Sequence, residues 1–277
     1  MSVAPVLKWV GGKRQLLPSI KKKLPKKIES YCEPFVGGGA VLFELQPQKA
    51  IVNDINSDLI LVYTVIRDDV EELIKLLETY PNEEQFYYDF RNIDRDPVKY
   101  GKLSSLEKAA RIIFLNKTCY NGLYRVNNSG EFNSPFGRYK NPNIVNATGL
   151  RAVSEYFNSA DVILHSGDFS CVLENLTEDT FVYFDPPYDP VSQTSSFTGY
   201  SKGAFGREQQ IRLREYCDML DSRNIKFMLS NSATDFVKEQ YSAYHITTVQ
   251  AKRAVNSVAD KRGNVEEVII TNYEEQN

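Results

Sequence analysis

Cysteine and histidine are scarce in this chain of 277 residues, which contains four cysteines and two histidines. No two cysteines have the CxxC spacing of a zinc-ligand pair or a redox motif, and each histidine stands apart from them. Because zinc sites and disulfide frameworks need clustered or paired side chains, the sequence predicts neither a metal ion nor a disulfide. Reduced thiols fit a cytoplasmic protein best, since the cytosol keeps cysteines reduced.

Long hydrophobic runs are missing as well. No apolar stretch approaches the roughly 18 residues that a membrane-spanning helix needs, so no membrane partner is expected. The first residues, MSVAPVLKWVGGK, lack the charged-then-apolar layout of a signal peptide. Apolar residues form 42% and charged residues 25% of the chain, which is typical of a globular protein. A chain of this length can form one large domain or a core domain that carries an insertion.

A net positive charge is also lacking, because 33 Lys and Arg face 36 Asp and Glu and the net charge is −3. This balance argues at first against a nucleic-acid partner, but the charges are distributed unevenly. Residues 1–30 contain eight basic residues and one acid, residues 111–141 contain five and one, and residues 68–96 are strongly acidic. A bipolar molecule can bind a polyanion through one face while its total charge stays slightly negative. The cluster from Lys21 to Lys23 can equally be a solvated helix face.

Strand and helix patterns alternate at both ends of the sequence, with a helical block between them. Apolar and β-branched runs predict strands near residues 31–35, 50–56, 161–169, 181–188, 226–232, 245–251 and 265–273. Helical spacing of apolar residues is found near residues 13–24, 40–45, 59–80, 83–93, 105–120, 147–158 and 206–223. The alternation predicts an α/β protein with a parallel sheet and one insertion. The last two runs, which no helix separates, predict an antiparallel hairpin at the sheet edge.

Residues 120–143 differ sharply from their surroundings. Their sequence, YNGLYRVNNSGEFNSPFGRYKNPN, is rich in Asn, Gly, aromatic and basic residues and has no helical period. This composition is typical of a loop or hairpin.

Three further segments place polar or glycine residues after predicted strands. The sequence EPFVGGGA contains the glycine turn (Phe35–Gly39), which follows one strand and opens a helix. Three glycines permit a tight turn whose backbone amides can approach a ligand. Asp54 ends the next strand, where an acid is well placed for ribose hydroxyls, and Asp168-Phe169 ends a third, where an acid and a ring could face a purine. The alternatives are plain turn geometry for the glycines, which do not form GxGxxG, and a helix cap for Asp168.

The segment TFVYFDPPYDP runs an apolar strand into an acid, two prolines and a tyrosine. Pro186 and Pro187 cannot donate to a sheet ladder, so the strand ends there and the backbone stiffens. Asp185 then lies at the carboxyl edge of a parallel sheet, where open α/β folds bind ligands. A carboxylate and a backbone carbonyl can both accept from one –NH₂ group, and Tyr188 can stack on a flat heterocycle. The segment therefore predicts a holder for an aromatic amine; the alternative is a proline-stiffened strand end with a packed tyrosine.

In combination, these motifs resemble the DNA adenine methyltransferase (Dam) family. LKWVGGKRQLL, EPFVGGGAV, NDINSD, YNGLYRVN, GEFNSPFGRYKNP and YFDPPY occur in the order of its α group, and the resemblance extends from about Lys8 to Tyr273. It implies a Rossmann-like class I methyltransferase fold with a mixed, mostly parallel seven-stranded sheet and a C-terminal antiparallel hairpin. The catalytic domain would comprise residues 1–56 and 160–277. Residues 57–159 would form an inserted, mainly helical domain that recognises DNA.

The resemblance also implies S-adenosylmethionine as cofactor. Its methionine end would be surrounded by Trp9, Lys13 and the turn of Phe35, Gly37, Gly38 and Gly39. Asp54 would hold the ribose, and Asp168 with Phe169 the adenine. Asp185, which also borders the cofactor, and the Pro186 carbonyl would grip the amino group of the target adenine; Pro187 would keep them rigid and Tyr188 would stack on the ring.

The same resemblance implies double-stranded DNA as partner, methylated by a monomer of a bacterial or phage-encoded protein. A target adenine inside a duplex must be flipped out to be reached. Tyr120 and Leu123 would wedge into the stack, Arg125 and Lys8 would each read a guanine, and Asn121, Asn127 and Asn133 would read or position neighbouring groups. The residues expected at phosphates are Arg91, Arg138, Tyr139 and Lys140.

The recognition segment is similar to that of members acting on GATC, although Tyr124 and Val126 depart from the family pattern beside Arg125. Three other functions remain open. An RNA or protein amino-group methyltransferase would carry similar cofactor motifs, but more often with Asn in place of Asp185. A DNA-binding module without activity would leave DPPY unused, and a nicotinamide dehydrogenase would need the GxGxxG spacing.

Overall fold

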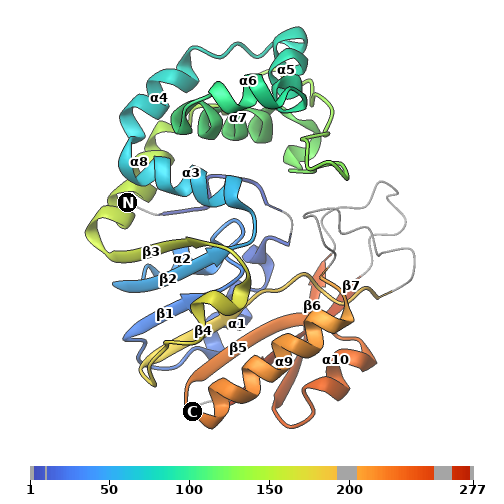
Figure 1. Cartoon of the computed structure of the whole chain (residues 1–277). Helices are drawn as coiled ribbons and strands as arrows, with labels where there is room; N and C mark the ends of the chain where they lie inside the picture. Colours follow the sequence, from blue (N-terminus) through green and yellow to red (C-terminus); the bar gives the residue numbers. More distant parts are fainter. Residues whose placement is uncertain (1–2, 10, 192–204, 253–263, 275–277) are drawn as a thin grey trace.

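The computed structural model describes residues 3–9, 11–191, 205–252 and 264–274 (Figure 1). Its centre is a seven-stranded sheet in the order β3-β2-β1-β4-β5-β7-β6. The five strands from β3 to β5 along this order are parallel, whereas β7 is antiparallel to both β5 and β6. The strands are β1 (Ser30–Glu33), β2 (Lys49–Asp54), β3 (Asp161–Ser166), β4 (Thr180–Phe184), β5 (Lys226–Ser232), β6 (His245–Lys252) and β7 (Asn264–Thr271). The expected class I methyltransferase architecture, with its C-terminal antiparallel hairpin, is confirmed.

Both faces of the central strands are buried, and alternate residues enter different halves of the core. In β4, Phe181 and Tyr183 belong to one hydrophobic cluster, while Val182 and Phe184 belong to the other. This is the two-residue period of a strand whose successive side chains point to opposite faces. It explains why β4 appears in the sequence as a continuous apolar run, as expected of a buried parallel strand.

A layer of helices covers each face. On one face, α3 (Ser57–Asp68) and α8 (Ala147–Ser159) contact each other and β3, and they contribute to the first cluster. On the other, α9 (Arg207–Ser222) contacts β5 and contributes to the second cluster, as does α10 (Asp235–Gln240) (Figure 1). Shorter elements complete both layers: Ile20 of α1 (Leu17–Lys23) and Val41 of α2 (Ala40–Leu45) belong to the first cluster, and Phe169 of η4 (Phe169–Val172) belongs to the second. η1 (Lys13–Gln15) precedes α1.

The remaining helices form a block beyond α3 and α8. They are α4 (Val70–Glu78), α5 (Glu84–Arg91), η2 (Asn92–Arg95), α6 (Pro97–Lys102) and α7 (Ser105–Thr118). Phe114 of α7 lies among the rings of Tyr80, Phe86 and Phe90, whose centroids are 5.4–5.7 Å away. This aromatic contact explains how a polar, acidic stretch of sequence folds compactly.

Helix boundaries follow local capping signals more closely than apolar periodicity. The single helix expected over residues 59–80 is two helices, because Asp69 leaves helical geometry with φ −136° and ψ 39°. α7 begins at a capping box, in which the Ser104 hydroxyl accepts the Glu107 N–H at 3.2 Å and the Glu107 carboxylate accepts the Ser104 N–H at 2.8 Å. α6 and α10 were not predicted, since α6 buries no residue and α10 buries only Val237, so neither shows an apolar helical period.

The loop predicted over residues 120–143 contains one 3₁₀ turn, η3 (Tyr120–Gly122), and two isolated antiparallel bridges. The bridges join Cys119 to Phe136 and Val126 to Phe132. Residues 119–136 are called the hairpin segment below. Among the helices of the described residues, none combines the length and apolar character of a membrane span, and no cluster of potential metal ligands occurs in the same part of the chain.

Candidate active site

The carboxyl ends of β1, β2 and β3 are tied together by one buried amide. Asn53, which is 1% exposed, donates from Nδ2 to the carbonyls of Pro34 and Gly167 at 3.0 Å each. Its Oδ1 contacts Nδ1 of His165 at 3.0 Å. Asn53 was not among the predicted site residues; its sequence signals are a polar residue at the end of a buried strand and its place at the start of the NDINSD motif.

The glycine turn has the backbone geometry that glycine alone adopts readily. Gly37 and Gly39 have φ values of +47° and +69°, in the left-handed region. A side chain at Gly39 would meet the Phe43 ring at 2.7 Å, and one at Gly37 would meet Cδ1 of Trp9 at 3.2 Å. Trp9 therefore packs directly on the turn.

Asp54 holds the same turn through a hydrogen bond to its backbone. One carboxylate oxygen accepts the Gly37 N–H at 3.0 Å and the other accepts the Asn56 N–H at 2.9 Å. Burial raises the pKa of Asp54 to about 6, while these two N–H groups oppose the rise. The acid thus holds the glycine turn and the start of α3 in one arrangement.

Asp168 and Phe169 lie beside the glycine turn at the end of β3. Phe169 is buried and stacks on Phe35 of the turn, with ring centroids 5.3 Å apart. Asp168 forms a bidentate ion pair with Arg212 of α9 at 2.7 and 2.9 Å, and this hydrogen-bonded contact lowers the pKa of Asp168 to about 2. The Arg212 guanidinium also lies 4.7 Å above the Phe169 ring. Arg212 was not predicted, because its helix is far from Asp168 in the sequence.

The end of β4 brings an acid, a lysine and a tyrosine into contact. Nζ of Lys13, a residue that is 6% exposed, lies 2.6 Å from Oδ1 of Asp185 and 4.4 Å from the centroid of the Tyr188 ring. Burial raises the pKa of Asp185, and the Lys13 charge opposes that rise. Ser230 of β5 donates to the same Oδ1 at 3.4 Å. Within the described part of the chain, Oδ2 of Asp185 has no hydrogen-bond partner, so an acceptor remains there.

Side chains from β5, β7 and α9 hold the proline segment after β4. The Pro187 carbonyl accepts from Gln210 at 2.8 Å, and the Tyr188 hydroxyl donates to Glu267 at 2.9 Å. The Asp189 N–H donates to Asn231 at 3.0 Å. The rigidity expected from the prolines is therefore reinforced by tertiary contacts that the local sequence does not reveal.

The polar groups of the hairpin segment are largely engaged with one another. Arg125 donates to the side-chain oxygen of Asn133 at 2.7 Å and remains exposed. Asn127 accepts the Ser129 and Glu131 N–H groups at 3.0 Å, so it closes the turn of the hairpin. The remaining predicted residues here are Tyr120, which is 59% exposed, Asn121, which is exposed with φ +58°, and Leu123, which is half-buried.

The other predicted DNA contacts lie around this segment. The backbone of Lys8 is clamped by Asn116 of α7, which accepts its N–H at 3.0 Å and donates to its carbonyl at 2.9 Å. The guanidinium of Arg91 is 4.8 Å from the Tyr88 ring. The exposed residues are Arg138, which pairs with Glu84 at 3.1 Å, Tyr139 and Lys140. The structure therefore gathers the residues predicted for the cofactor and for catalysis at one edge of the sheet, with Trp9 and Lys8 adjoining the hairpin segment.

Comparison with known proteins agrees with this arrangement. Residues 9–255 match the family model of the D12 class N6 adenine-specific DNA methyltransferases. The chain is 44% identical to the Type II methyltransferase M1.LlaDCHI of Lactococcus lactis subsp. cremoris, over 99% of this chain and 96% of that protein. It is 45% identical to the Type II methyltransferase M.MjaIII of Methanocaldococcus jannaschii, over 99% and 100% respectively. It is 35% identical to the DNA adenine methylase of Escherichia coli K12, over 95% and 93%. The chain thus belongs to the D12 class of N6 adenine-specific DNA methyltransferases and is an adenine-specific DNA methyltransferase.

Proposed function

We propose that this enzyme transfers a methyl group from S-adenosylmethionine to the exocyclic amino group of a flipped-out adenine, in the sequence GATC of duplex DNA. The observation that carries the proposal is the site at the end of β4. There the Lys13 ammonium contacts both the Asp185 carboxylate and the Tyr188 ring, while one oxygen of Asp185 keeps no partner among the described residues.

The residues at the sheet edge fit the proposed cofactor. Gly37 and Gly38 of the glycine turn present backbone without side chains next to Trp9, and Asp54 accepts the Gly37 N–H. Phe35 and Phe169 offer stacked rings beside the Asp168 carboxylate, which suits a purine with an amino group. When bound, S-adenosylmethionine supplies an electrophilic methyl group on its sulfonium. Because Arg212 occupies the Asp168 oxygens, an adenine amine would share that carboxylate with the guanidinium.

The residues after β4 act on the target amine by position and charge. The lone pair of an adenine amino group is delocalised into the ring and is a poor nucleophile. Acceptance of its hydrogens by Asp185 and the Pro186 carbonyl returns electron density to the nitrogen, and Tyr188 stacks on the ring. Fixed acceptors of this kind contribute by orientation and by preorganised electrostatics.

Recognition of DNA is assigned to residues 57–159 together with Lys8 of the N-terminal segment. Arg125 and Lys8 are the guanine readers. Arg125 supports this assignment because it is exposed yet held by Asn133, and an arginine fork matches the O6 and N7 acceptors of guanine. GATC reads the same on both strands, so a monomer can methylate one strand at a time. We place the enzyme in the cytoplasm, where it would meet its substrate DNA.

The test is transfer of labelled methyl groups to four substrates: a GATC duplex, a duplex with one base pair of the site changed, RNA and protein. We expect label in the GATC duplex alone, on N6 of adenine. Label in RNA or protein instead would favour the other amino-group methyltransferases.

The first prediction concerns Asp185 itself. Asp185→Ala should abolish methylation, because the amine loses its charged acceptor, while DNA affinity should remain within about threefold by the usual behaviour of groups that act mainly in the transition state. Methylation and duplex binding are measured on the same preparation. Activity near that of the wild type would refute the assignment.

A further inference from the structure

Tyr124 of the hairpin segment has a position that its exposed neighbours do not share. It is 5% exposed, although it precedes the exposed Arg125. Its ring stacks on Trp9, with centroids 4.7 Å apart and an interplanar angle of 27°. Its edge meets Phe132, on the opposite side of the hairpin, with centroids 5.6 Å apart. Tyr124 is therefore the contact through which the hairpin rests on Trp9.

Trp9 in turn rests on the glycine turn. A Cβ added at Gly37 or Gly38 would lie 3.2 Å from a Trp9 atom in each case, which is closer than ordinary van der Waals contact, so Trp9 lies directly against both glycines. The turn, the indole and the phenol thus form three consecutive layers. A shift of the turn of a few tenths of an ångström must be taken up by Trp9 and Tyr124, because close-packed interiors transmit displacement.

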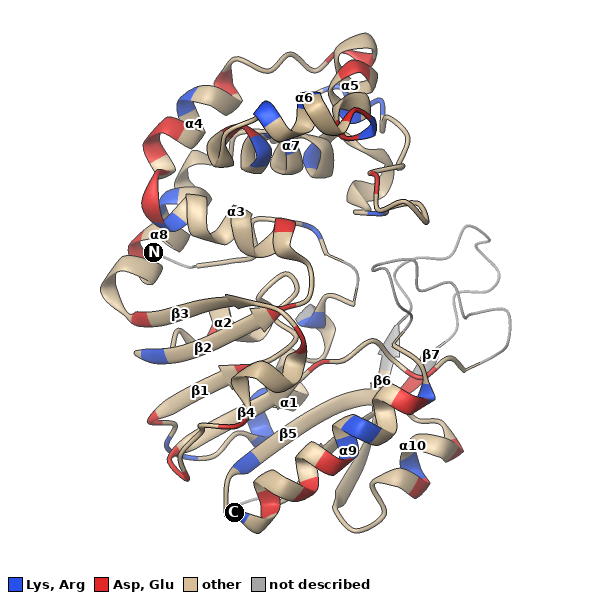
Figure 2. Cartoon of the chain, in the orientation of Figure 1, with Lys and Arg blue, Asp and Glu red and all other residues tan. Residues whose placement is uncertain are grey.

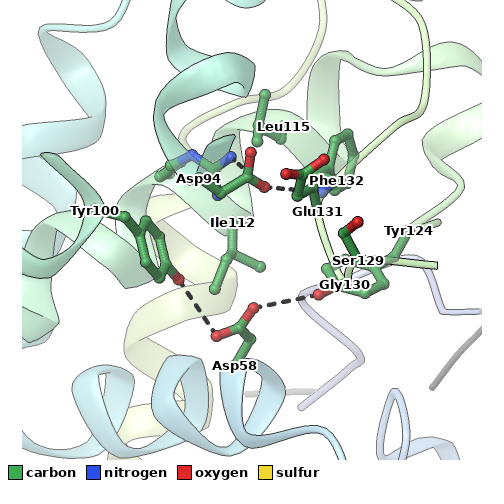
Figure 3. Close-up of a pocket in the computed structure, with 11 residues that line it drawn as sticks. Asp58, Asp94, Tyr100, Ile112, Leu115, Tyr124, Ser129, Gly130, Glu131 and Phe132 are labelled. Atoms are coloured by element: carbon green, nitrogen blue, oxygen red, sulfur yellow. Dashed lines mark hydrogen bonds and ion pairs between the residues drawn. The ribbon is translucent and has the colours of Figure 1, made fainter. Parts of the chain in front are cut away.

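The Tyr124 hydroxyl reaches the same turn by a second route. It donates to Oδ2 of Asp58 at 3.3 Å, while Tyr100 donates to Oδ1 at 3.4 Å (Figure 3). Asp58 lies in the first turn of α3. The N-cap residue of that helix, Asn56, donates its N–H to Asp54, which also holds Gly37. Tyr124 is therefore joined to the glycine turn through Trp9 and through the start of α3.

A pocket of about 160 Å³ adjoins these contacts (Figure 3). Its lining includes Asp58, Tyr124, Arg111, Phe132 and the tip of the hairpin at residues 129–131. Since the hairpin borders a hollow on this side, it has fewer packing neighbours there to fix its tilt. Its orientation then depends more strongly on the contacts of Tyr124 with Trp9 and Asp58.

We propose that Tyr124 is a positioning residue that couples the cofactor turn to the DNA-reading hairpin, so that cofactor and specific DNA bind cooperatively. The proposal rests on the proposed roles of the glycine turn and Arg125. A ligand that orders the turn fixes Trp9 and Tyr124, and hence the adjacent Arg125, in the orientation that reads the site. By linkage, specific DNA must favour cofactor binding by the same factor.

The experiment measures that factor directly. The affinity for S-adenosylhomocysteine, which cannot donate a methyl group, is determined by calorimetry without and with a saturating GATC duplex. We expect the duplex to tighten binding in the wild type by about fivefold or more, the usual lower range of such coupling. In Tyr124→Leu the factor should fall below about twofold. Tyr124→Phe, which keeps the stack but loses the hydroxyl, should give an intermediate value.

Two matched controls separate coupling from stability. Tyr100→Phe removes the other hydroxyl bound to Asp58 but touches neither Trp9 nor the hairpin stack, and Phe86→Leu removes a ring from the α5–α7 cluster. Both should keep the wild-type factor. If Tyr124→Leu does not fold, the coupling factors of Tyr124→Phe and Tyr100→Phe are compared instead. A lower factor in Tyr124→Phe supports the proposal, and equal factors overturn it.

Two results would overturn the proposal while leaving the proposed function intact. They are a wild-type enzyme that methylates GATC but shows no coupling, and a Tyr124→Leu enzyme that keeps the wild-type factor. A wild type that methylates no adenine in duplex DNA would overturn both.

Discussion

Two residues show how burial and charge define the chemistry of the site. Asp185 is an acid whose pKa is raised by burial, and Lys13 opposes that rise at 2.6 Å. The resemblance assigned Lys13 to the cofactor, whereas the geometry also gives it a direct contact with Asp185, the acid proposed to act in catalysis. An ion pair this enclosed depends on both partners, because either charge alone would be costly to bury.

This pair predicts a pH effect. The Asp185 carboxylate must be ionised to act as a charged acceptor for one N–H of the amine, and Lys13→Gln removes the charge that favours ionisation. The pKa of Asp185 should then rise further above its ordinary value. Activity of Lys13→Gln should therefore be lost at a higher pH than in the wild type as the solution is acidified.

The measurement is the acidic limb of kcat/KM against pH, which reports groups of the free enzyme. Lys13→Arg, which keeps the charge, is the control and should move the limb less. An unmoved limb in Lys13→Gln would show that Lys13 does not support ionisation of Asp185.

Arg125 supports a second prediction at this scale. Arg125→Ala should relax discrimination at one guanine of the site by about 1–3 kcal/mol, the usual contribution of a bidentate arginine–guanine contact. The ratio of kcat/KM for the GATC duplex to that for duplexes changed at each guanine provides the measurement. A site preference identical to that of the wild type would exclude Arg125 as a base reader.

Among the elements, the glycine turn between β1 and α2 is the most constrained by its backbone. Gly39 combines φ +69° with a Phe43 ring where its Cβ would lie. Gly101 in α6 has nothing within 4 Å of that position. The two glycines therefore differ in backbone conformation and in the space around the Cβ position, although a residue count does not distinguish them.

Substitution of these glycines should have opposite signs. Gly39→Ala should lower the free energy of unfolding by about 1–3 kcal/mol, since it adds strain and overpacking. Gly101→Ala should leave it unchanged or raise it by up to about 1 kcal/mol, because a helical position favours alanine. Urea denaturation of both variants is the check. Equal changes in the free energy of unfolding would mean that the glycine turn shifts to accommodate the added methyl group.

On the scale of the whole molecule, the charge is separated although the total is −3. Acidic residues colour much of the α4 ribbon in Figure 2, and Lys21 of the basic α1 pairs with Glu44 of α2. The basic residues near the hairpin segment are thus the better candidates for phosphate contacts than those of α1.

The salt dependence of DNA binding tests this distribution. Affinity for the GATC duplex should fall steeply with salt, and Lys140→Ala should reduce the slope of log K against log salt by about one without changing site preference. Lys22→Ala, at an exposed position of α1, is the control and should leave the slope unchanged. A larger change of slope in Lys22→Ala than in Lys140→Ala would indicate that the DNA-binding surface lies on α1.

Local sequence was sufficient to predict structure wherever the conformation of a segment depends on its own residues. The strand end before Asp185 and the turn at Gly37 and Gly39 were predicted because proline restricts the backbone at the residue itself, whereas glycine permits the positive φ of a tight turn. The break at Asp69 was missed, since the apolar period continues through it. α10 was missed because it buries only Val237 and so shows no apolar period.

The sequence by itself therefore determined the strand–helix order, the class of chemistry and most residues at the sheet edge. Only the tertiary structure decided the partners: Arg212 for Asp168, Glu267 for Tyr188, and Trp9 for Tyr124. The physical reason is that these partners come from α9, from the antiparallel β7 and from the segment before η1, which only the assembled sheet and helices bring to the site. Backbone restrictions can be read from neighbouring residues, whereas contacts between distant side chains depend on how the sheet and its helices assemble.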